Sequence, residues 1–422
     1  MNKRILYRIL IGIFLNFILV SLSSAANFYV RSGANGANNG SDWANAWKQM
    51  KDINYSVINP GDTIYIAAGT YGALSIDKSG TPGNPITFKR ATTGSHGSST
   101  GWASNYDGQV IIDGGDSLGA IGIGEGSGRG QSHITIDGVT RYGIKVQNAS
   151  VGVRAVRGPS DNITLRYLDI GDSGSYKMGE DGIQGRGSNL LVEYSYIHDN
   201  DSLETHGDGI QWFAGNNIVV RYSVFKNNGQ IMMLTETAWG NDYVNDLKVY
   251  YNVFYNRGGT HYNGISKKLC PQSGSWNIYN NTFDLEATNN NGMNNLLSGA
   301  GSCSRMDFKN NAVIYSNASS TGDISHSYNA YDNSGQYSVH YVPSETGQVA
   351  TADLGFVNVD SADYHLTSSS PLIGKGVNVG LSTDFDGKPV PTNPTIGAFE
   401  SGKSSSTTTT SALLPPTNLR VQ

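Results

Sequence analysis

The chain has 422 residues, of which 53 are glycine and 24 are tyrosine, and only 15% are charged. Its formal net charge of −5 at pH 7 argues against a surface that binds nucleic acid over a whole face. This composition is typical of short strands joined by tight turns and excludes a mainly helical or disordered chain.

Residues 1–26 have the pattern of a secretory signal peptide. Three basic residues precede an apolar run from Ile9 to Leu22, and Ser24-x-Ala26 supplies the small residues of a cleavage site. The run is too short and wrongly flanked for a membrane span, and no other run approaches that length. Cleavage removes three basic residues and no acidic one, so the net charge falls from −5 to −8. We expect a monomer that is secreted, periplasmic or attached to the cell surface.

Residues 27–80 precede a regular repeat. If Trp43–Val57 forms a helix, then Trp43, Trp47, Met50 and Ile53 share its apolar face. A helix in this place would cover the unpaired edges at the open end of a strand-built body. The sequence therefore predicts an N-terminal helical cap.

Six segments repeat at a spacing of 27 to 30 residues. They are Asn162–Ile170, Asn189–Ile197, Asn217–Phe225, Asp246–Phe254, Ser275–Phe283 and Arg305–Val313. Three columns of their alignment are apolar or nearly so: Ile163/Leu190/Ile218/Leu247/Trp276/Met306, Leu165/Val192/Val220/Val249/Ile278/Phe308 and Ile170/Ile197/Phe225/Phe254/Phe283/Val313. The first two columns lie two residues apart, which is strand periodicity with one face inward. The repeat predicts an all-β fold, a right-handed parallel β-helix of about ten to twelve coils.

Two further features agree with stacked coils. Small polar residues recur in the turn after the second column, namely Ser195, Ser223, Asn252, Asn281 and Asn311, and stacked side chains there can cap the backbone of a buried bend. The two cysteines, Cys270 and Cys303, fall about one coil apart. Because export is expected, a disulfide is favoured over two free thiols.

The period is lost after Val313. Residues 328–400 are expected to form the last coils and an irregular C-terminal cap, which makes residues 27–400 one domain. Residues 401–411 are a Ser/Thr tract with the composition of a flexible linker. Residues 412–422 resemble the first strand of a fibronectin type III domain and are too few to form one.

The N-terminal motif Pro60–Tyr71, followed by Ser79-Gly-Thr-Pro-Gly-Asn-Pro-Ile-Thr, resembles the entry segment of exported bacterial right-handed β-helix proteins. This group includes the family-nine polysaccharide lyases. The motifs Asp384-Phe-Asp-Gly and Ile396-Gly-Ala-Phe-Glu are similar to the closing segment of many such proteins. The resemblance spans most of residues 27–400 and implies a pectate-lyase-like fold.

Insertions between coils concentrate before one predicted strand, at residues 171–181, 199–208 and 256–263. If Ile183, Ile210, Leu234 and Ile265 face inward, then Gln184, Gln211, Thr235 and Ser266 face outward. With Arg186 and Glu236, the two glutamines are candidate substrate-binding residues. Trp212 and Trp239 could stack on sugar rings, although alternation equally places Trp212 in the core.

Asp181 and Asp208 both precede Gly-Ile, one coil apart. Carboxylates about 4.8 Å apart can share a Ca²⁺ ion, with Glu180 and Glu204 as further ligands. The alternative is that each Asp-Gly pair simply builds a turn. The pair resembles the Asp-lined calcium site of family-nine lyases, which has a denser cluster.

A lysine is the catalytic base of family-nine lyases, and Lys268 or Lys267 would be its counterpart here. Alternation favours Lys268, because Lys267 would point into the core, and a solvated surface pair is the structural alternative. His261 and Tyr262 could instead act as base and acid. The expected function is a polysaccharide lyase acting on a uronic-acid polymer, with Ca²⁺ as a cofactor. The alternatives are a glycan-binding or stalk protein without catalysis, and a uronate epimerase or glycoside hydrolase.

Overall fold

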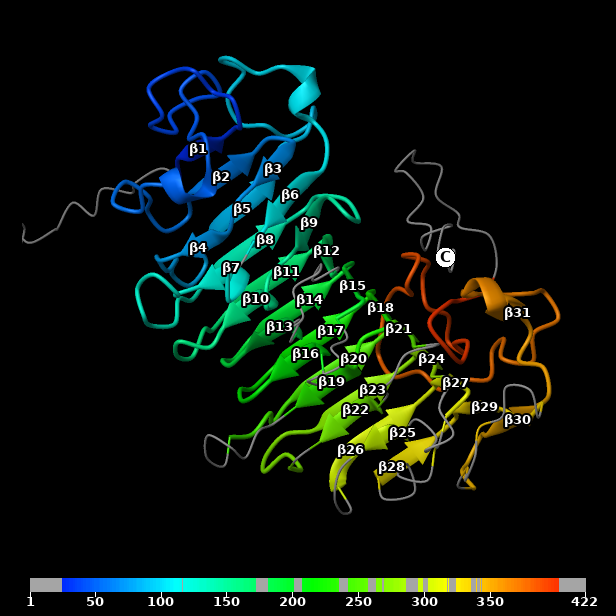
Figure 1. The fold of residues 1–422 in the computed structure, drawn as a ribbon. Coiled ribbons are helices and arrows are strands. Elements are labelled where there is room, and N and C mark those ends of the chain that lie inside the picture. The colour runs from blue at the N-terminus through cyan, green and yellow to red at the C-terminus, as the bar shows by residue number, and fades with distance from the viewer. Residues whose placement is uncertain are drawn as a thin grey trace, which may run out of the picture.

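The structure is a computed structural model. It describes residues 25–115, 117–171, 181–200, 207–234, 242–256, 263–267, 269–285, 295–298, 303–316, 318, 324–334, 339, 342 and 344–401. The described residues contain no α-helix and build three long parallel sheets, which we name A, B and C. The chain passes through one strand of each sheet in turn and then starts the next coil, which gives the right-handed parallel β-helix drawn in Figure 1.

Sheets A and B have eleven described strands each, which agrees with the predicted number of coils. Sheet A consists of β1 (Asn27–Val30), β2 (Thr63–Ile66), β5 (Ile86–Arg90), β8 (Ile134–Asp137), β11 (Ile163–Arg166), β14 (Leu190–Glu193), β17 (Ile218–Arg221), β20 (Leu247–Tyr250), β23 (Trp276–Tyr279), β26 (Cys303–Lys309) and β28 (Ile324–Ser327). Sheet B consists of β3 (Gly69–Tyr71), β6 (Val110–Asp113), β9 (Ile144–Gln147), β12 (Leu168–Gly171), β15 (Tyr196–His198), β18 (Val224–Lys226), β21 (Val253–Tyr255), β24 (Thr282–Asp284), β27 (Ala312–Ile314), β29 (Ala330–Asp332) and β30 (Val349–Thr351).

Sheet C has eight described strands. They are β4 (Leu74–Ile76), β7 (Gly119–Ile123), β10 (Val151–Ala155), β13 (Asp181–Gly185), β16 (Asp208–Trp212), β19 (Gln230–Leu234), β22 (Asn263–Lys267) and β25 (Asn295–Ser298). A separate antiparallel pair is formed by β31 (Phe356–Asn358) and β32 (Asp363–Leu366). Three single turns of 3-10 helix complete the described elements: Met50–Asp52, Ser104–Tyr106 and Val359–Ser361.

The three apolar columns stack inside one lumen, as the repeat predicts. Ile163 pairs with Leu190 and Leu165 with Val192 in sheet A, and Ile170 pairs with Ile197 in sheet B. The same register continues to the last predicted repeat, and the side chains of all three columns belong to one buried cluster. Each strand thus buries one face against the other two sheets, and burial of this apolar surface is the main force holding the coils in register.

The predicted polar ladder is also confirmed and is one coil longer than expected. The backbone N–H of each member donates to the side-chain oxygen of the next, from Ser195 through Asn311 to Asn329, over 2.9–3.1 Å. Asn329 ends the ladder on the carboxylate of Glu345, which accepts from its backbone N–H at 2.6 Å. The buried bend between sheets A and B therefore has its polar groups paired coil by coil.

The amphipathic helix predicted over Trp43–Val57 does not form. Residues 43–57 contain only the 3-10 turn Met50–Asp52, although Trp43, Trp47 and Met50 are fully buried as expected. Trp47 instead continues the sheet, because its N–H donates to Tyr29 O at 2.9 Å and its carbonyl accepts from Arg31 N at 2.8 Å. Extended backbone satisfies the edge of β1 directly, which a helix cannot do.

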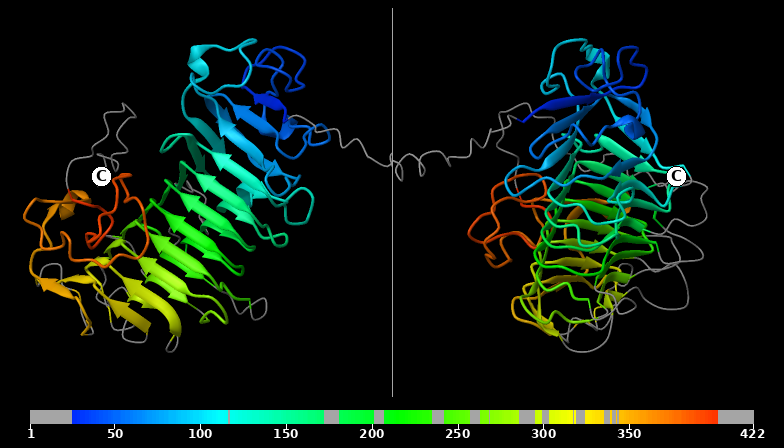
Figure 2. Two further views of the ribbon diagram at one scale, coloured as in Figure 1. Left: turned by 180° about the vertical axis from the view of Figure 1, so that it is seen from behind. Right: turned by 90° about the vertical axis from the view of Figure 1, so that its left-hand side faces the viewer.

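Residues 352–400 do not form the predicted C-terminal cap. β29 and β30 are the expected last coils, but residues 352–400 then run along the outer side of sheet B. Their apolar side chains pack on the outward residues of β18, β21, β27 and β29. Figures 1 and 2 show this orange-to-red segment, which we name the C-terminal extension, beside the coils rather than across their open end.

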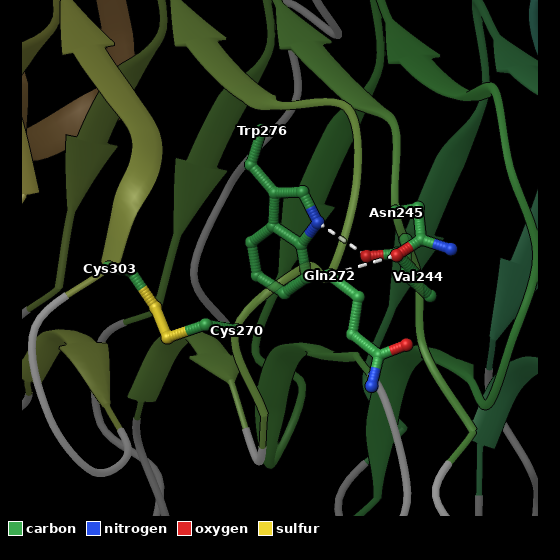
Figure 3. The surroundings of a disulfide bond; sticks show 6 residues. All are labelled: Val244, Asn245, Cys270, Gln272, Trp276 and Cys303. Carbon is green, nitrogen blue, oxygen red and sulfur yellow. Dashed lines mark hydrogen bonds between the residues drawn. A yellow bond between two sulfur atoms is a disulfide. The ribbon is translucent and has the colours of Figure 1, made fainter.

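The predicted disulfide is present. Cys270 and Cys303 are bonded, with their Cα atoms 5.7 Å apart. The bond joins the segment between β22 and β23 to the first residue of β26, and Figure 3 shows it together with the indole of Trp276, whose Nε1 donates to Val244 O at 2.7 Å. It ties two neighbouring coils together, and Cys270 follows Lys267, the last residue of β22, by three residues.

Candidate functional site

The outer face of sheet C carries a column of side chains, one from each coil, that is mostly polar. Arg154 pairs in register with Gln184, Gln184 with Gln211, and the same column continues through Met233 to Ser266. Gln184 lies at the centre of the row, and its Nε2 donates to Gln211 Oε1 at 2.8 Å and to Asp181 Oδ2 at 2.7 Å. Ile183 and Ile210 belong to the lumen cluster, so the neighbouring Gln184 and Gln211 face outward, as predicted.

The register predicted for β19 is wrong by two residues. Met232, and not Leu234, aligns with Ile210 and Ile265, while Leu234 aligns with Trp212. Met233 therefore occupies the outward position that the sequence reading gave to Thr235, which lies outside the described residues along with Glu236. The run Met232-Met233-Leu234 is apolar on both faces, so alternation could not show which residue faces the lumen.

Trp212 belongs to the core and not to the binding face. Its side chain is fully buried in the lumen cluster, and its Nε1 donates to Gly187 O at 3.0 Å. The buried indole needs a partner for its N–H, and a main-chain carbonyl of the turn after β13 supplies it. Gly185 makes room for the ring, because a Cβ there would lie 2.4 Å from it.

Arg186 lies just beyond β13 and forms an ion pair with Asp242, with Nη2 and Oδ2 separated by 2.8 Å. Both side chains are partly exposed, so the pair is of modest strength in water. Arg186 is the cation nearest in the chain to the Gln184–Gln211 pair on this face. Its guanidinium has five N–H donors, and the fork geometry suits a carboxylate.

Asp181 and Asp208 begin adjacent strands of sheet C, one coil apart, as predicted. Both are almost completely buried, and Asp181 Oδ1 accepts from the N–H of Asp208 at 2.9 Å while its Oδ2 accepts from Gln184. These bonds give Asp181 a structural role at the entry of the strand. They also orient Gln184 toward the binding face.

Two carboxylates supply only part of the six to eight oxygen ligands that Ca²⁺ takes. Within the described ranges, no group of three His, Cys, Asp or Glu side chains could hold a metal ion. The described residues therefore do not by themselves fit a calcium ion, and Glu180 and Glu204 lie outside them.

Several other predicted residues also fall outside the described ranges, namely Lys268, His261, Tyr262, Glu236 and Trp239. Lys267 pairs in register with Leu234 at the end of β22, and its side chain is not among those described.

The sequence reading missed three charged residues on the same face. Arg154 in β10 and Arg157 just after it both bind Glu125, which follows β7. The alternation in Val151-Gly-Val-Arg-Ala155, with its valines inward, was a usable signal for an outward arginine. The irregular spacing of these early coils hid it, because they do not align with the six later repeats.

Comparisons with known proteins rest on structure alone. No family model matches the chain, and no curated protein matches its sequence. Among solved structures, the pectate lyase Pel9A superposes with a TM-score of 0.51 at 17% identity, over 90% of this chain and 98% of that one. The likeness is one of fold. An alginate lyase from Paenibacillus sp. str. FPU-7 covers 72% of this chain at 13% identity with a TM-score of 0.39, and pectate lyase Bsp165PelA from Bacillus sp. N165, in complex with trigalacturonate, covers 78% at 14% with the same TM-score.

The Pel9A-like fold agrees with the resemblance seen in the entry and closing motifs, and both describe the same parallel β-helix. Among the described residues, no helix is long and apolar enough to cross a membrane.

Proposed function

We propose that the protein is an exported polysaccharide lyase that cleaves a uronic-acid polymer by β-elimination on the outer face of sheet C. The observation that carries the proposal is the row of Arg154, Gln184 and Gln211, which places polar side chains in register at the spacing of the coils. Coils repeat at about 4.8 Å, so a polymer lying along the row would meet the polar side chains of three successive coils. The fold shared with a pectate lyase supports the same reading.

For this reaction the protein must supply a base, a proton for the leaving oxygen and a group that neutralises the uronate carboxylate. A base removes the C5 proton of a uronate, the electron pair forms a C4–C5 double bond, and the C4–oxygen bond to the next sugar breaks as that oxygen takes up a proton. Neutralising the uronate carboxylate acidifies the C5 proton. In this proposal the guanidinium of Arg186 binds the carboxylate, and Gln184 and Gln211 hold the sugar hydroxyls.

The proposed base is Lys268, with Lys267 as the alternative lysine and the His261–Tyr262 pair as the alternative acid–base couple. The proposal also includes a calcium ion held by Asp181 and Asp208 with Glu180 and Glu204. Dialysis of the protein against EGTA, followed by addition of Ca²⁺, tests this part separately. Loss of activity that Ca²⁺ restores and Mg²⁺ does not would support it.

The proposal extends to the location and organisation of the chain. The disulfide between Cys270 and Cys303 is of the kind that persists in oxidising compartments, in agreement with a signal peptide at residues 1–26. We propose one β-helix domain with its extension over residues 27–400, a linker at 401–411 and a short segment at 412–422 that resembles the first strand of a fibronectin type III domain.

The deciding experiment follows the absorbance of unsaturated product from pectate, alginate and chondroitin, with and without Ca²⁺. We expect turnover of at least one polymer by the wild-type protein and its loss in Lys268→Ala. The matched control is Lys248→Ala, which removes an exposed lysine from the outer face of sheet A. Absence of product from every uronate polymer, with retained binding to one of them, would replace the lyase by a glycan-binding protein.

A further inference from the structure

Two arginines on the face of sheet C share a single carboxylate. Arg154 Nη1 and Arg157 Nε bind separate oxygens of Glu125, the second at 2.8 Å. Arg154 and Glu125 are mostly buried, with side chains 17% and 19% exposed, whereas Arg157 is 43% exposed. The cluster therefore has a fixed inner part and an arginine that reaches solvent.

The fold makes room for this cluster. A Cβ at Gly122 would lie 2.6 Å from Glu125 Cγ, and one at Gly119 would lie 2.9 Å from Arg154 Cβ. Both glycines are in β7, so the strand beneath the cluster is bare where the two side chains lie. A side chain at either position would force Glu125 or Arg154 to shift.

The loop that carries Glu125 is anchored to the previous coil. Asp77 Oδ1 accepts from the N–H of Ser127 at 2.8 Å, and Ser75 Oγ accepts from the N–H of Gly126 at 3.2 Å. Asp77 is the other acid beside this loop, and its second oxygen accepts from Ser75 Oγ at 2.8 Å. Glu125 is thus held in place from its own backbone, and Asp77 is engaged with the loop rather than with the arginines.

Ion pairs on the outer face of sheet A are built differently. Arg166 has Asp137 and Arg221 has Glu193, one acid for each arginine, and Arg221 also donates to Tyr250. On sheet C one acid serves two arginines, and the exposed Arg129 lies on the same loop. The cluster on sheet C therefore carries excess positive charge, which the pairs on sheet A do not.

The cluster continues the candidate site. Arg154 stands opposite Gln184 in the ladder, one coil toward the N-terminus, and one coil corresponds to about 4.8 Å along the axis. A polymer held by Gln184 and Gln211 would reach this position with a neighbouring sugar unit. The carboxylate of that unit would contact the guanidinium groups of Arg154 and Arg157, which Glu125 holds in place.

We propose that Arg154 and Arg157 form an anion subsite that binds the carboxylate of a uronate unit next to the unit held at Gln184. Glu125 is a positioning residue that fixes the two guanidinium groups and leaves N–H donors of each fork for the ligand. The identity of the ligand as a uronate polymer rests on the function proposed above. The presence of an anion-binding cluster does not depend on catalysis.

Binding measured without turnover tests the subsite. The full-length protein is run in native gels containing polygalacturonate, alginate or neutral dextran, and retardation as a function of polymer concentration gives Kd. We expect Arg157→Gln and Arg154→Gln each to weaken binding to an acidic polymer by about tenfold. The slope of log Kd against log salt should decrease, and dextran should not retard any of the proteins.

Arg221→Gln is the matched control, because it removes an arginine from an ion pair on the opposite sheet. It should bind as the wild type does, whatever its effect on stability. Arg157 is the more exposed arginine of the cluster, so its substitution keeps the test valid if Arg154→Gln folds poorly.

The outcomes separate the subsite from the lyase proposal. Wild-type cleavage of a uronate polymer with unchanged binding by Arg157→Gln and Arg154→Gln overturns the subsite and leaves the lyase. Weakened binding in both variants, with no unsaturated product from the wild type, overturns the lyase and supports the subsite. A wild-type protein retarded by none of the acidic polymers overturns the subsite.

Discussion

Asn252 and Asn281 lie one coil apart and share two hydrogen bonds. The backbone N–H and the side-chain Nδ2 of Asn252 both donate to Oδ1 of Asn281, each at 3.0 Å. Asn281 repeats the arrangement with Asn311, and all three side chains are completely buried. Each asparagine therefore satisfies the bend of its own coil and that of the coil before it.

Asn281→Ala should destabilise the protein by about 2–4 kcal/mol, because it leaves the N–H of Asn252 and other buried polar groups without partners. Urea unfolding followed by circular dichroism measures the change. Asn189→Gly is the matched control, since Asn189 belongs to an exposed row of asparagines with Asn162 and Asn217 and has φ of +60°, which glycine adopts easily. A loss in the control as large as in Asn281→Ala would contradict a special role for the buried ladder.

The stacked core could be predicted from sequence because each coil repeats the same physical problem. Ile163, Leu190 and their successors must all fill one lumen, so the apolar columns and the ladder at Asn281 appear in sequence at the coil spacing. The alignment fixed the pairing residue by residue in sheets A and B. Coils of a different length, such as the one that contains Arg154, do not align with the six repeats. Their pairing could therefore not be predicted in the same way.

The candidate site was less predictable, for reasons that differ from residue to residue. Trp212 was ambiguous because alternation and aromatic stacking gave opposite answers, and packing space beside Gly185 decided it. The pairing of Arg186 with Asp242 joins residues 56 apart, across coils whose relative placement the sequence does not give. The extension over sheet B was unpredictable because it follows no repeat.

Trp212 and Gln211 are neighbours in β16 with opposite roles. Trp212→Ala should cost about 3–5 kcal/mol of stability, because it opens a cavity in the lumen and removes the donor to Gly187 O. Gln211→Ala should cost about 1 kcal/mol, the value of one hydrogen bond. In the proposed site it should also weaken uronate binding in the native-gel assay. Equal destabilisation by the two substitutions would contradict their opposite placement.

Removal of the disulfide should lower stability without changing the fold. The bond closes a separation of 33 residues, for which chain-entropy reasoning gives about 3–4 kcal/mol. The double substitution Cys270→Ser and Cys303→Ser should show this loss in urea unfolding and keep the strand signal in circular dichroism. Dithiothreitol should shift the wild-type midpoint toward that of the double variant and leave the variant unchanged. A wild-type midpoint that does not move under full reduction would show that the bond adds no stability.

His365 makes the stability of the C-terminal extension depend on pH. Burial disfavours its charged form, but its hydrogen bonds to Asp363 at 2.6 Å and to Asp386 at 3.1 Å outweigh burial and raise its pKa to about 9. A raised folded-state pKa stabilises the protein fully below the ordinary value of 6.5, and this contribution is lost as the pH rises through 9.

Other groups of the extension act outside that window. Burial raises the pKa of Asp384 to about 6, so its contribution is present below its ordinary pKa of 3.8 and is lost by the time the pH passes 6. Although burial opposes it, the hydrogen bond from His365 lowers the pKa of Asp386, so this carboxylate loses its stabilising effect only at acidic pH. The pKa of His198 on sheet B is raised too. This effect is present in both the wild type and His365→Gln, so it cancels in the difference between their stabilities.

His365→Gln should therefore remove a pH-dependent part of the stability between about pH 6.5 and 9. At pH 6 the wild type should exceed the variant by roughly 2 kcal/mol, a figure kept below the full shift because the imidazole is 24% exposed. At pH 10 the free energies of unfolding of the two proteins should differ only by the contribution of the hydrogen bonds that glutamine does not reproduce. Thermal unfolding at half-unit steps of pH gives the two curves. Parallel curves across this range would show that His365 is not protonated through its contacts with Asp363 and Asp386.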